Sequence, residues 1–227
     1  MIRNNYLWFS DPSTFNDPYD FNISFDYSCN ENILREYYKK VREKYKLMGD
    51  NSFESYDVEQ LISEYLQDPE KFINDHKQCM QEKKQNDYGV CCFSEKCNNL
   101  LMWSHYGDKH KGICLGFNTK MDKDFFLYPF KVDYPSKFPT YNYFENKFDK
   151  KILYTQFHFA TKSKDWKYEK ELRIVKYNKI RGKIQFKKEI ICEVIFGYKT
   201  DKEIIKKVLK LFERYNYNVR FYQMVLK

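Results

Sequence analysis

The chain has 227 residues, of which 42% are hydrophobic and 32% charged, and its net charge is +8. This length suffices for one hydrophobic core and no linker-like stretch divides the chain, so we expect a single domain over residues 1–227. No run of 18 apolar residues and no apolar secretory signal occurs, which excludes a membrane-spanning helix and predicts a cytoplasmic protein with reduced cysteines and no membrane association.

Helical patterns dominate the first half of the chain. A strand is predicted first, over Tyr6–Ser10, where aromatic and small residues alternate. Apolar residues at three- and four-residue spacing then predict helices over 31–48 and 57–84, the second interrupted at Asp68-Pro69. The amino-terminal half is therefore expected to be mainly helix.

Strands dominate the second half. Apolar runs bounded by turn residues predict strands at 88–94, 111–117, 127–134, 170–177, 183–186, 190–197 and, as an edge or closing strand, 218–225. Helices are predicted at 100–106, 145–161 and 201–214. Helices first and strands later favour an α+β fold, in which the helical amino-terminal half packs on a mixed or antiparallel central sheet.

The positive charge is concentrated in the carboxy-terminal third. Residues 161–227 carry 19 basic and 8 acidic side chains, an excess of 11, whereas the rest of the chain has a net charge of −3. Clustered lysines displace counterions from phosphates, so this basic third could bind nucleic acid or a protein partner. The same excess also fits a lysine-rich composition in which the lysines only solvate a face. Both interpretations stay open.

Several common sites are excluded. The seven glycines are too widely spaced for a Rossmann fingerprint, a Walker loop or a kinase loop, and no Gly-x-Ser-x-Gly motif occurs. Cysteines and histidines gather between residues 91 and 114, but no Cys-x-x-Cys pair exists among them. We therefore expect no metal site.

Two clusters of polar and aromatic residues are candidates for a binding site. The first is Trp8-Phe9-Ser10 followed by Phe15-Asn16-Asp17-Pro18; its structural alternative is a turn in which Asn and Asp cap backbone donors. The second joins Phe93-Ser94, at a predicted strand end, with Trp103-Ser104-His105-Tyr106. A histidine beside aromatic rings is either a catalyst or an ordinary core or capping residue.

A third cluster carries two glutamates at alternate positions, Trp166-x-x-Glu169-x-Glu171-x-Arg173. In an extended strand, alternation places Glu169, Glu171 and Arg173 on one face. One interpretation is that this face is exposed to solvent and forms salt bridges that contribute little to stability. The other is that it places a carboxylate in a cleft beside Trp166.

In this order the three clusters resemble a family of bacterial and phage proteins known as domain of unknown function 2971. Its pattern is matched by Trp8–Pro18, by Leu101–Gly112 and by Trp166–Arg173. Relatives begin with an additional strand, which bears an arginine, and a short helix, whereas only Met1–Tyr6 precede the first cluster here. Because that unit would hold NAD in an enzyme of the kind described next, an inactive form, a non-enzymatic relative and a start upstream of Met1 all stay open.

The chain is more distantly similar to ADP-ribosyltransferases, in which a serine-bearing strand and a later Glu-x-Glu flank a nicotinamide pocket. This resemblance implies a related fold, NAD as substrate, an unknown protein or nucleic-acid acceptor, and a role as a toxin or antiviral effector. It implies that Glu171 binds the ribose hydroxyl and stabilises positive charge, and that Glu169 orients the acceptor. With His105 as a further catalytic candidate, the expected NAD-binding residues are Ser94, Trp103, Tyr106, Phe93, Ser10 and Asn16.

Two other functions compete with this one. The first is a non-catalytic binding module that uses the basic carboxy-terminal third. The second is a hydrolase with His105 as its base, although the sequence offers no recognisable nucleophile for it. Whether the chain is an enzyme is thus left open by the sequence.

Overall fold

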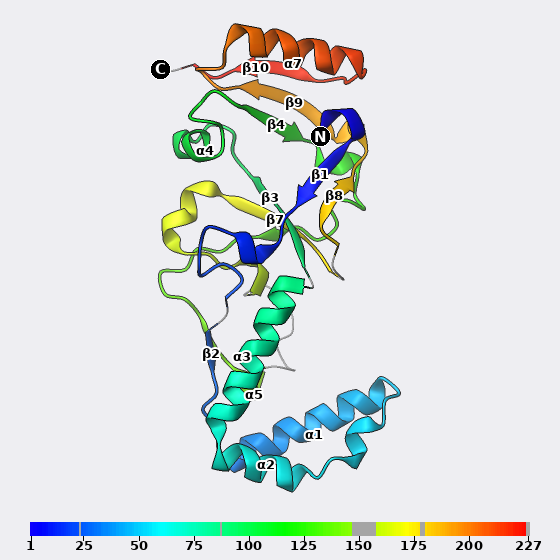
Figure 1. Ribbon diagram of the computed structural model, residues 1–227, viewed down its shortest axis with the longest axis vertical. Coiled ribbons are helices and arrows are strands. Elements are labelled where there is room, and N and C mark those ends of the chain that lie inside the picture. The colour runs from blue at the N-terminus through cyan, green and yellow to red at the C-terminus, as the bar shows by residue number, and fades with distance from the viewer. Residues whose placement is uncertain (23, 87, 147–157, 178–179, 226–227) are drawn as a thin grey trace.

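The computed structural model describes residues 1–22, 24–86, 88–146, 158–177 and 180–225, and it confirms the α+β class. Figure 1 shows an elongated molecule with most strands gathered in its upper part. Three helices occupy its lower half, namely α1 (Glu31–Leu47), α2 (Val58–Gln67) and α3 (Pro69–Asn86). None of the described helices is long and apolar enough to span a lipid bilayer.

Four helices begin close to where the sequence predicts, because a polar side chain caps each start. Each cap accepts hydrogen bonds from backbone N–H groups in the first turn, which have no partner within the helix. The caps are Asn30 for α1, Asp57 for α2, Asn99 for α4 (Leu100–His105) and Asp201 for α7 (Lys202–Arg214). Pro69 begins α3, as expected of a residue that suits the first turn of a helix but cannot continue the one before it.

The described strands form four small sheets instead of one central sheet. Two have three strands each: antiparallel β3 (Gly89–Ser94), β7 (Glu171–Lys176) and β5 (Phe130–Lys131), and mixed β4 (Ile113–Phe117), β9 (Ile191–Phe196) and β10 (Arg220–Gln223). Two have two strands each: β1 (Tyr6–Phe9) with β8 (Gly182–Gln185), and β2 (Ser24–Asp26) with β6 (Thr140–Asn142). The predicted mixed or antiparallel pairing is therefore present, and β10 is an edge strand as predicted.

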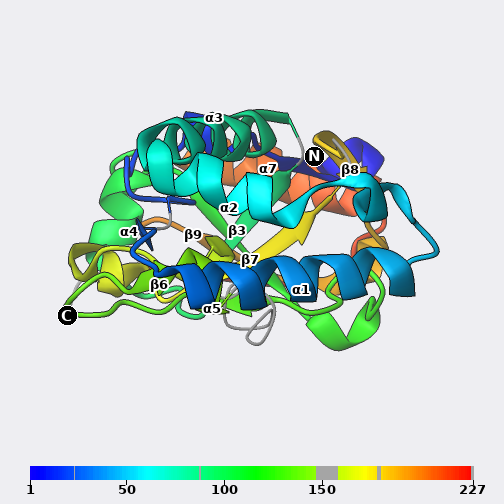
Figure 2. The same cartoon turned by 90° about the horizontal axis from the view of Figure 1, so that it is seen from below.

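The amino-terminal helices pack on one another and not on a central sheet, which corrects the predicted arrangement. Their buried side chains form a cluster that comprises Leu34, Tyr37, Tyr38, Ile62 and Tyr65 together with Tyr27 and with Tyr143 and Phe144 of α5 (Tyr143–Asn146). Figure 2 shows α1 and α2 from the end of the molecule, in front of the strands. Because this aromatic cluster covers the apolar faces of α1 and α2, those faces are not available to the larger sheets.

A second core holds the sheets together and fixes the strand that carries the site. It is formed by Leu7 and Phe9 of β1, Ile174 of β7, Val194 and Phe196 of β9, and Phe212 of α7, with further aromatic residues around them. Ser10 and Val90 also exchange two backbone hydrogen bonds, of 2.8 and 2.9 Å, which join β1 to β3. Strand β3 is thus held between Ser10 on one side and β7 on the other.

Two predicted elements differ from the structure. The strand predicted at 127–134 is extended only at β5, because Tyr128 has a left-handed φ of 53° that interrupts it. The helix predicted at 145–161 lies mainly outside the described residues, and the described segments 143–146 and 158–160 are helical. The other predicted helices and strands are confirmed, with ends that differ by a few residues.

Candidate active site

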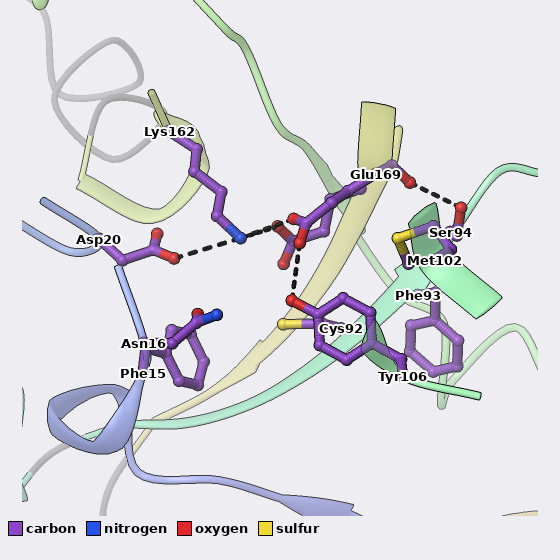
Figure 3. Close-up of a pocket in the computed structure, with 11 residues that line it drawn as sticks. Phe15, Asn16, Asp20, Cys92, Phe93, Ser94, Met102, Tyr106, Lys162 and Glu169 are labelled. Atoms are coloured by element: carbon purple, nitrogen blue, oxygen red, sulfur yellow. Dashed lines mark hydrogen bonds and ion pairs between the residues drawn. The ribbon is translucent and has the colours of Figure 1, made fainter. Parts of the chain in front are cut away.

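A cavity of about 320 Å³ lies beside the start of β7 (Figure 3). Its walls come from the turn before β2, from the end of β3, from α4, and from the 3-10 helix η5 (Lys164–Glu169) that leads into β7. The described residues that line it are Phe15, Asn16, Asp20, Cys92, Phe93, Ser94, Met102, Tyr106, Lys162, Glu169 and Glu171. Segments far apart in the sequence therefore meet at one place.

A left-handed turn sets Glu169 beside Glu171. The extended alternation predicted for the two glutamates is wrong, because Glu169 ends η5 and Lys170, with a φ of 47°, separates it from β7. The Ser94 hydroxyl donates to the carbonyl oxygen of Glu169 at 2.6 Å, and the Glu95 backbone N–H donates to that of Lys170 at 2.9 Å. These bonds fix the turn against the end of β3, so that both glutamate side chains face the same cavity.

Five charged side chains meet at the cavity wall in a buried network. They are Asp20, Lys162, Glu169, Glu171 and Arg173, and none is more than 5% exposed. The Lys162 ammonium lies 2.6 Å from Glu169 Oε2 and 3.4 Å from Glu171 Oε2, and Asp20 Oδ2 is 3.7 Å from the same nitrogen. Arg173 donates from Nε to Glu171 Oε1 at 2.7 Å, and its Nη1 lies 2.7 Å from Asp20 Oδ1. This burial rules out the solvated strand face that was one interpretation of the Glu-x-Glu pattern.

The pKa values of the network follow from burial and from its two cations. Burial alone would raise the pKa of Glu171, but the hydrogen bonds and charge of Arg173 and the charge of Lys162 hold it below its ordinary value. Burial also raises the pKa of Asp20, and Arg173 and Lys162 offset that rise only in part. For Lys162, burial favours loss of the proton, but the surrounding carboxylates outweigh it and raise the pKa of the ammonium. Glu171 is thus ionised and Lys162 protonated at neutral pH.

Three uncharged side chains complete the polar part of the cavity. The Tyr106 hydroxyl donates to Glu169 Oε1 at 2.8 Å and also interacts with the Asn16 side chain. The Cys92 thiol, which is accessible from the cavity, is hydrogen-bonded to Glu171. Burial, and then the charge of Glu171, raises the pKa of this thiol well above its ordinary value, so Cys92 is not an activated nucleophile.

We expect Glu171 to stabilise the fold at neutral pH and to lose that contribution in acid. Because its folded-state pKa lies below the ordinary value of 4.5, its contribution to the free energy of unfolding is complete above that value and declines as the pH falls through the folded pKa. Urea unfolding of the wild type and of Glu171→Gln at about pH 7, 5 and 3 checks this, since the other acidic groups largely cancel in the comparison. A difference in stability that stays constant between pH 5 and pH 3 contradicts the expectation.

Six of the nine residues proposed from the sequence line this cavity. They are Glu171, Glu169, Ser94, Tyr106, Phe93 and Asn16. The other three lie elsewhere. Ser10 pairs its backbone with Val90, and the buried Trp103 donates its indole N–H to the Cys97 carbonyl at 2.7 Å, with Gly107 packed on its ring. His105 is exposed outside the cavity, its ring 6.3 Å from that of Tyr168.

Phe15, which belongs to the first cluster but was not proposed as a site residue, also lines the cavity. The remaining lining residues were not proposed from the sequence, namely Asp20, Cys92, Met102 and Lys162. Lys162 and Asp20 carry no motif of their own, and no local pattern marks them as buried. Arg173 was expected to share a face with the two glutamates, and its full burial and its contact with Asp20 are new. The available signal was Arg173 itself, between apolar neighbours in the strand 171–176. A buried arginine requires nearby carboxylates, so its position indicates acidic partners from elsewhere in the chain.

The described part of the chain bears on two further predictions. No group of three or more His, Cys, Asp or Glu side chains in it is arranged to hold a metal ion. Of the cations in the basic carboxy-terminal third, Lys162 and Arg173 are internal and serve the buried network. Glu169 and Glu171 of the same third are buried with them, so this network does not change the excess of positive charge there, and binding of nucleic acid stays a prediction.

Comparison with known proteins gives a match to one family over part of the chain, and that family has no assigned activity. No curated protein matches the chain, and no solved structure does. Residues 102–174 match the model of a family described as protein of unknown function (DUF2971). That segment contains α4, Lys162, the Glu-x-Glu pair and Arg173, whereas Trp8–Pro18 lies outside it. The resemblance seen in the sequence is thus confirmed over this segment, which is similar to the DUF2971 family of proteins of unknown function.

Proposed function

We propose that this protein breaks the nicotinamide–ribose bond of NAD and transfers the ADP-ribosyl group to an acceptor or to water, in the manner of an ADP-ribosyltransferase or an NAD glycohydrolase. The observation that supports this most is the meeting of both carboxylates of the Glu-x-Glu pair with Tyr106 at one cavity. The cavity is at the small end of the range of about 300–1,000 Å³ usual for ligand pockets. It therefore suits the nicotinamide ribose half of NAD, with the remainder of the dinucleotide outside.

The proposed reaction assigns different roles to the two glutamates. The bond between the ribose and the nicotinamide nitrogen breaks, its electron pair goes to that nitrogen, and neutral nicotinamide leaves. The ribosyl group is left with oxocarbenium-like positive charge, as in glycoside cleavage. Ionised Glu171 stabilises that charge. A hydroxyl of the acceptor or of water then attacks the ribosyl carbon, and Glu169 takes the hydroxyl proton.

The aromatic and amide side chains suit the recognition of a flat ring. Tyr106 is half exposed, with its hydroxyl on Glu169, so its ring can stack on the leaving nicotinamide. Phe93 and Phe15 line other parts of the cavity, and Asn16 offers an amide to the ribose or to the carboxamide of nicotinamide. An enzyme that consumes NAD would act in its cell as a toxin or an antiviral effector, the role that we propose for this activity.

Release of nicotinamide from NAD, in the presence of cell lysate as a source of acceptors, tests the proposal. We expect release by the wild type and at least a roughly tenfold slower release by Met102→Trp, which places a large ring in the cavity without touching the carboxylates. Leu101→Trp is the matched control, because the neighbouring Leu101 is 49% exposed and does not line the cavity. No release by the wild type overturns the proposed function, and unchanged release by Met102→Trp overturns this cavity as its site.

A further inference from the structure

Two carboxylates that face one cavity must share a small volume. Glu169 and Glu171 both contact the ammonium of Lys162, at 2.6 and 3.4 Å, so these two oxygen atoms lie at most about 6 Å apart. Buried like charges at such separations do not both stay ionised on their own, and one of the two takes up a proton. The proposed reaction needs both groups ionised, since one stabilises positive charge and the other accepts a proton.

Lys162 is placed to resolve this conflict. Its side chain is 5% exposed and enters the network from the segment after residue 161, on the side away from Tyr106 in Figure 3. Its ammonium also lies 4.7 Å from the centre of the Trp166 ring, whose face attracts a cation. Arg173 contacts Glu171 and Asp20 but has no contact with Glu169 among the described residues. Within the described network, Lys162 is therefore the cation that serves both glutamates.

The titratable and charged groups around this pair come from every element that surrounds it. They are Asp20 before β2, Cys92 of β3, Tyr106 after α4, Tyr134 after β5, Lys162, Tyr168 of η5 and Arg173 of β7. Tyr106 and Cys92 donate hydrogen bonds to the pair, and the Tyr134 hydroxyl accepts one from the Glu171 backbone N–H at 2.9 Å. Removal of Lys162 therefore leaves one cation, Arg173, for three carboxylates.

We propose that Lys162 is a positioning residue that holds Glu169 and Glu171 side by side and keeps both of them ionised. The inference rests on the proposed function, because the proposed reaction is what requires two ionised glutamates. The contacts of Lys162 with Glu169 and Glu171 are the same whatever the substrate is. Without Lys162 the pair holds one proton near neutral pH. The variant then lacks the base of the reaction, although every group that touches the substrate is still present.

Carbon NMR titration of the glutamate carboxyl groups tests this without any activity measurement. In the wild type we expect both members of the pair to be ionised at neutral pH. In Lys162→Met we expect one of them to titrate at least about one pH unit higher than any carboxyl of the pair in the wild type. Lys167→Met, which removes an exposed lysine of η5, is the matched control and leaves the titration unchanged. Equal titration in Lys162→Met and wild type overturns the proposal.

Chemical rescue separates positioning from simple structural support. In Lys162→Ala, about 10–100 mM ethylammonium is expected to restore the wild-type titration of the pair, and, if NAD cleavage is present, the pH dependence of that cleavage. Neutral ethanol, which has the same size, is the control and restores neither. If Lys162→Met does not fold, the titration of the wild type still tests the proposal. A proton held by Glu169 or Glu171 at pH 7 in the wild type contradicts it. If the wild type cleaves NAD but the Lys162 variants titrate like the wild type, the role of Lys162 is wrong and the proposed function stands. If the variants titrate differently but the wild type does not cleave NAD, the proposed function is wrong and the role of Lys162 stands.

Discussion

Glu171→Gln is expected to lower kcat/KM for NAD cleavage by about 10²–10³-fold, the usual loss when one group that stabilises transition-state charge is removed. Glutamine keeps the size of the side chain and one oxygen that accepts from Arg173, but it removes the negative charge at the start of β7. The charge matters because the ribosyl group becomes positive only as the bond to nicotinamide breaks. Rates of nicotinamide release over a range of NAD concentrations measure the effect.

The matched control for this variant is Glu95→Gln. Glu95 follows β3, outside the cavity lining, and its carboxylate pairs with Lys131 at 3.1 Å on the surface. The same chemical change there should leave kcat/KM within about twofold, as a surface ion pair contributes little. Circular dichroism shows whether each variant is folded. A folded Glu171→Gln protein that keeps its rate within a few-fold of the wild type removes Glu171 from the mechanism.

Arg173→Met is expected to lower the free energy of unfolding by about 3–5 kcal/mol, the cost of removing one partner from a buried ion pair. Arg173 is fully buried, and its guanidinium donates to Glu171, to Asp20 and to the Phe159 carbonyl. Methionine fills a similar volume without charge, so the main consequence is that Lys162 remains as the cation for the buried carboxylates. Urea unfolding at neutral pH, followed by circular dichroism, measures the loss.

Two further variants test whether the loss in the free energy of unfolding comes from the carboxylates that lose Arg173 as their partner. Arg220→Met removes an arginine that is 71% exposed and paired with Glu193, and it should cost at most about 1 kcal/mol. Adding Asp20→Asn to Arg173→Met removes one of the stranded charges, so the double variant should be more stable than the Arg173→Met single variant. A double variant that is less stable than the single one would show that loss of packing, and not an unpaired charge, dominates the effect.

Local patterns in the sequence were enough to predict most of the elements and part of the site. The three- and four-residue spacing of apolar side chains predicted α1 and α2, because helix formation depends on neighbours within one or two turns. The Glu-x-Glu pattern and Tyr106, directly after α4, pointed to the cavity for a similar reason. Residues two to four apart along the chain keep a fixed spatial relation once the element forms.

The predictions that were wrong concern contacts between distant segments. The helices were expected on a central sheet, but the tyrosines of α1 and α2 pack with Tyr27, which follows β2, and with α5. Periodicity shows that a helix has an apolar face, yet it does not show which surface covers that face. Trp103 and His105 illustrate the same limit within one helix, since the ring of one is buried in the turn and the other faces outward.

The sequence by itself determined the helices, most strands, the α+β class and the family resemblance, because these depend on residues close together in the chain. Only the tertiary structure decided that Asp20, Lys162 and Arg173 join the two glutamates in one buried network. The sequence has 40 basic and 32 acidic side chains, and no local pattern in it distinguishes those that are buried from those that are exposed to solvent. What distinguishes them is the desolvation cost, which only partners brought in from distant segments can offset.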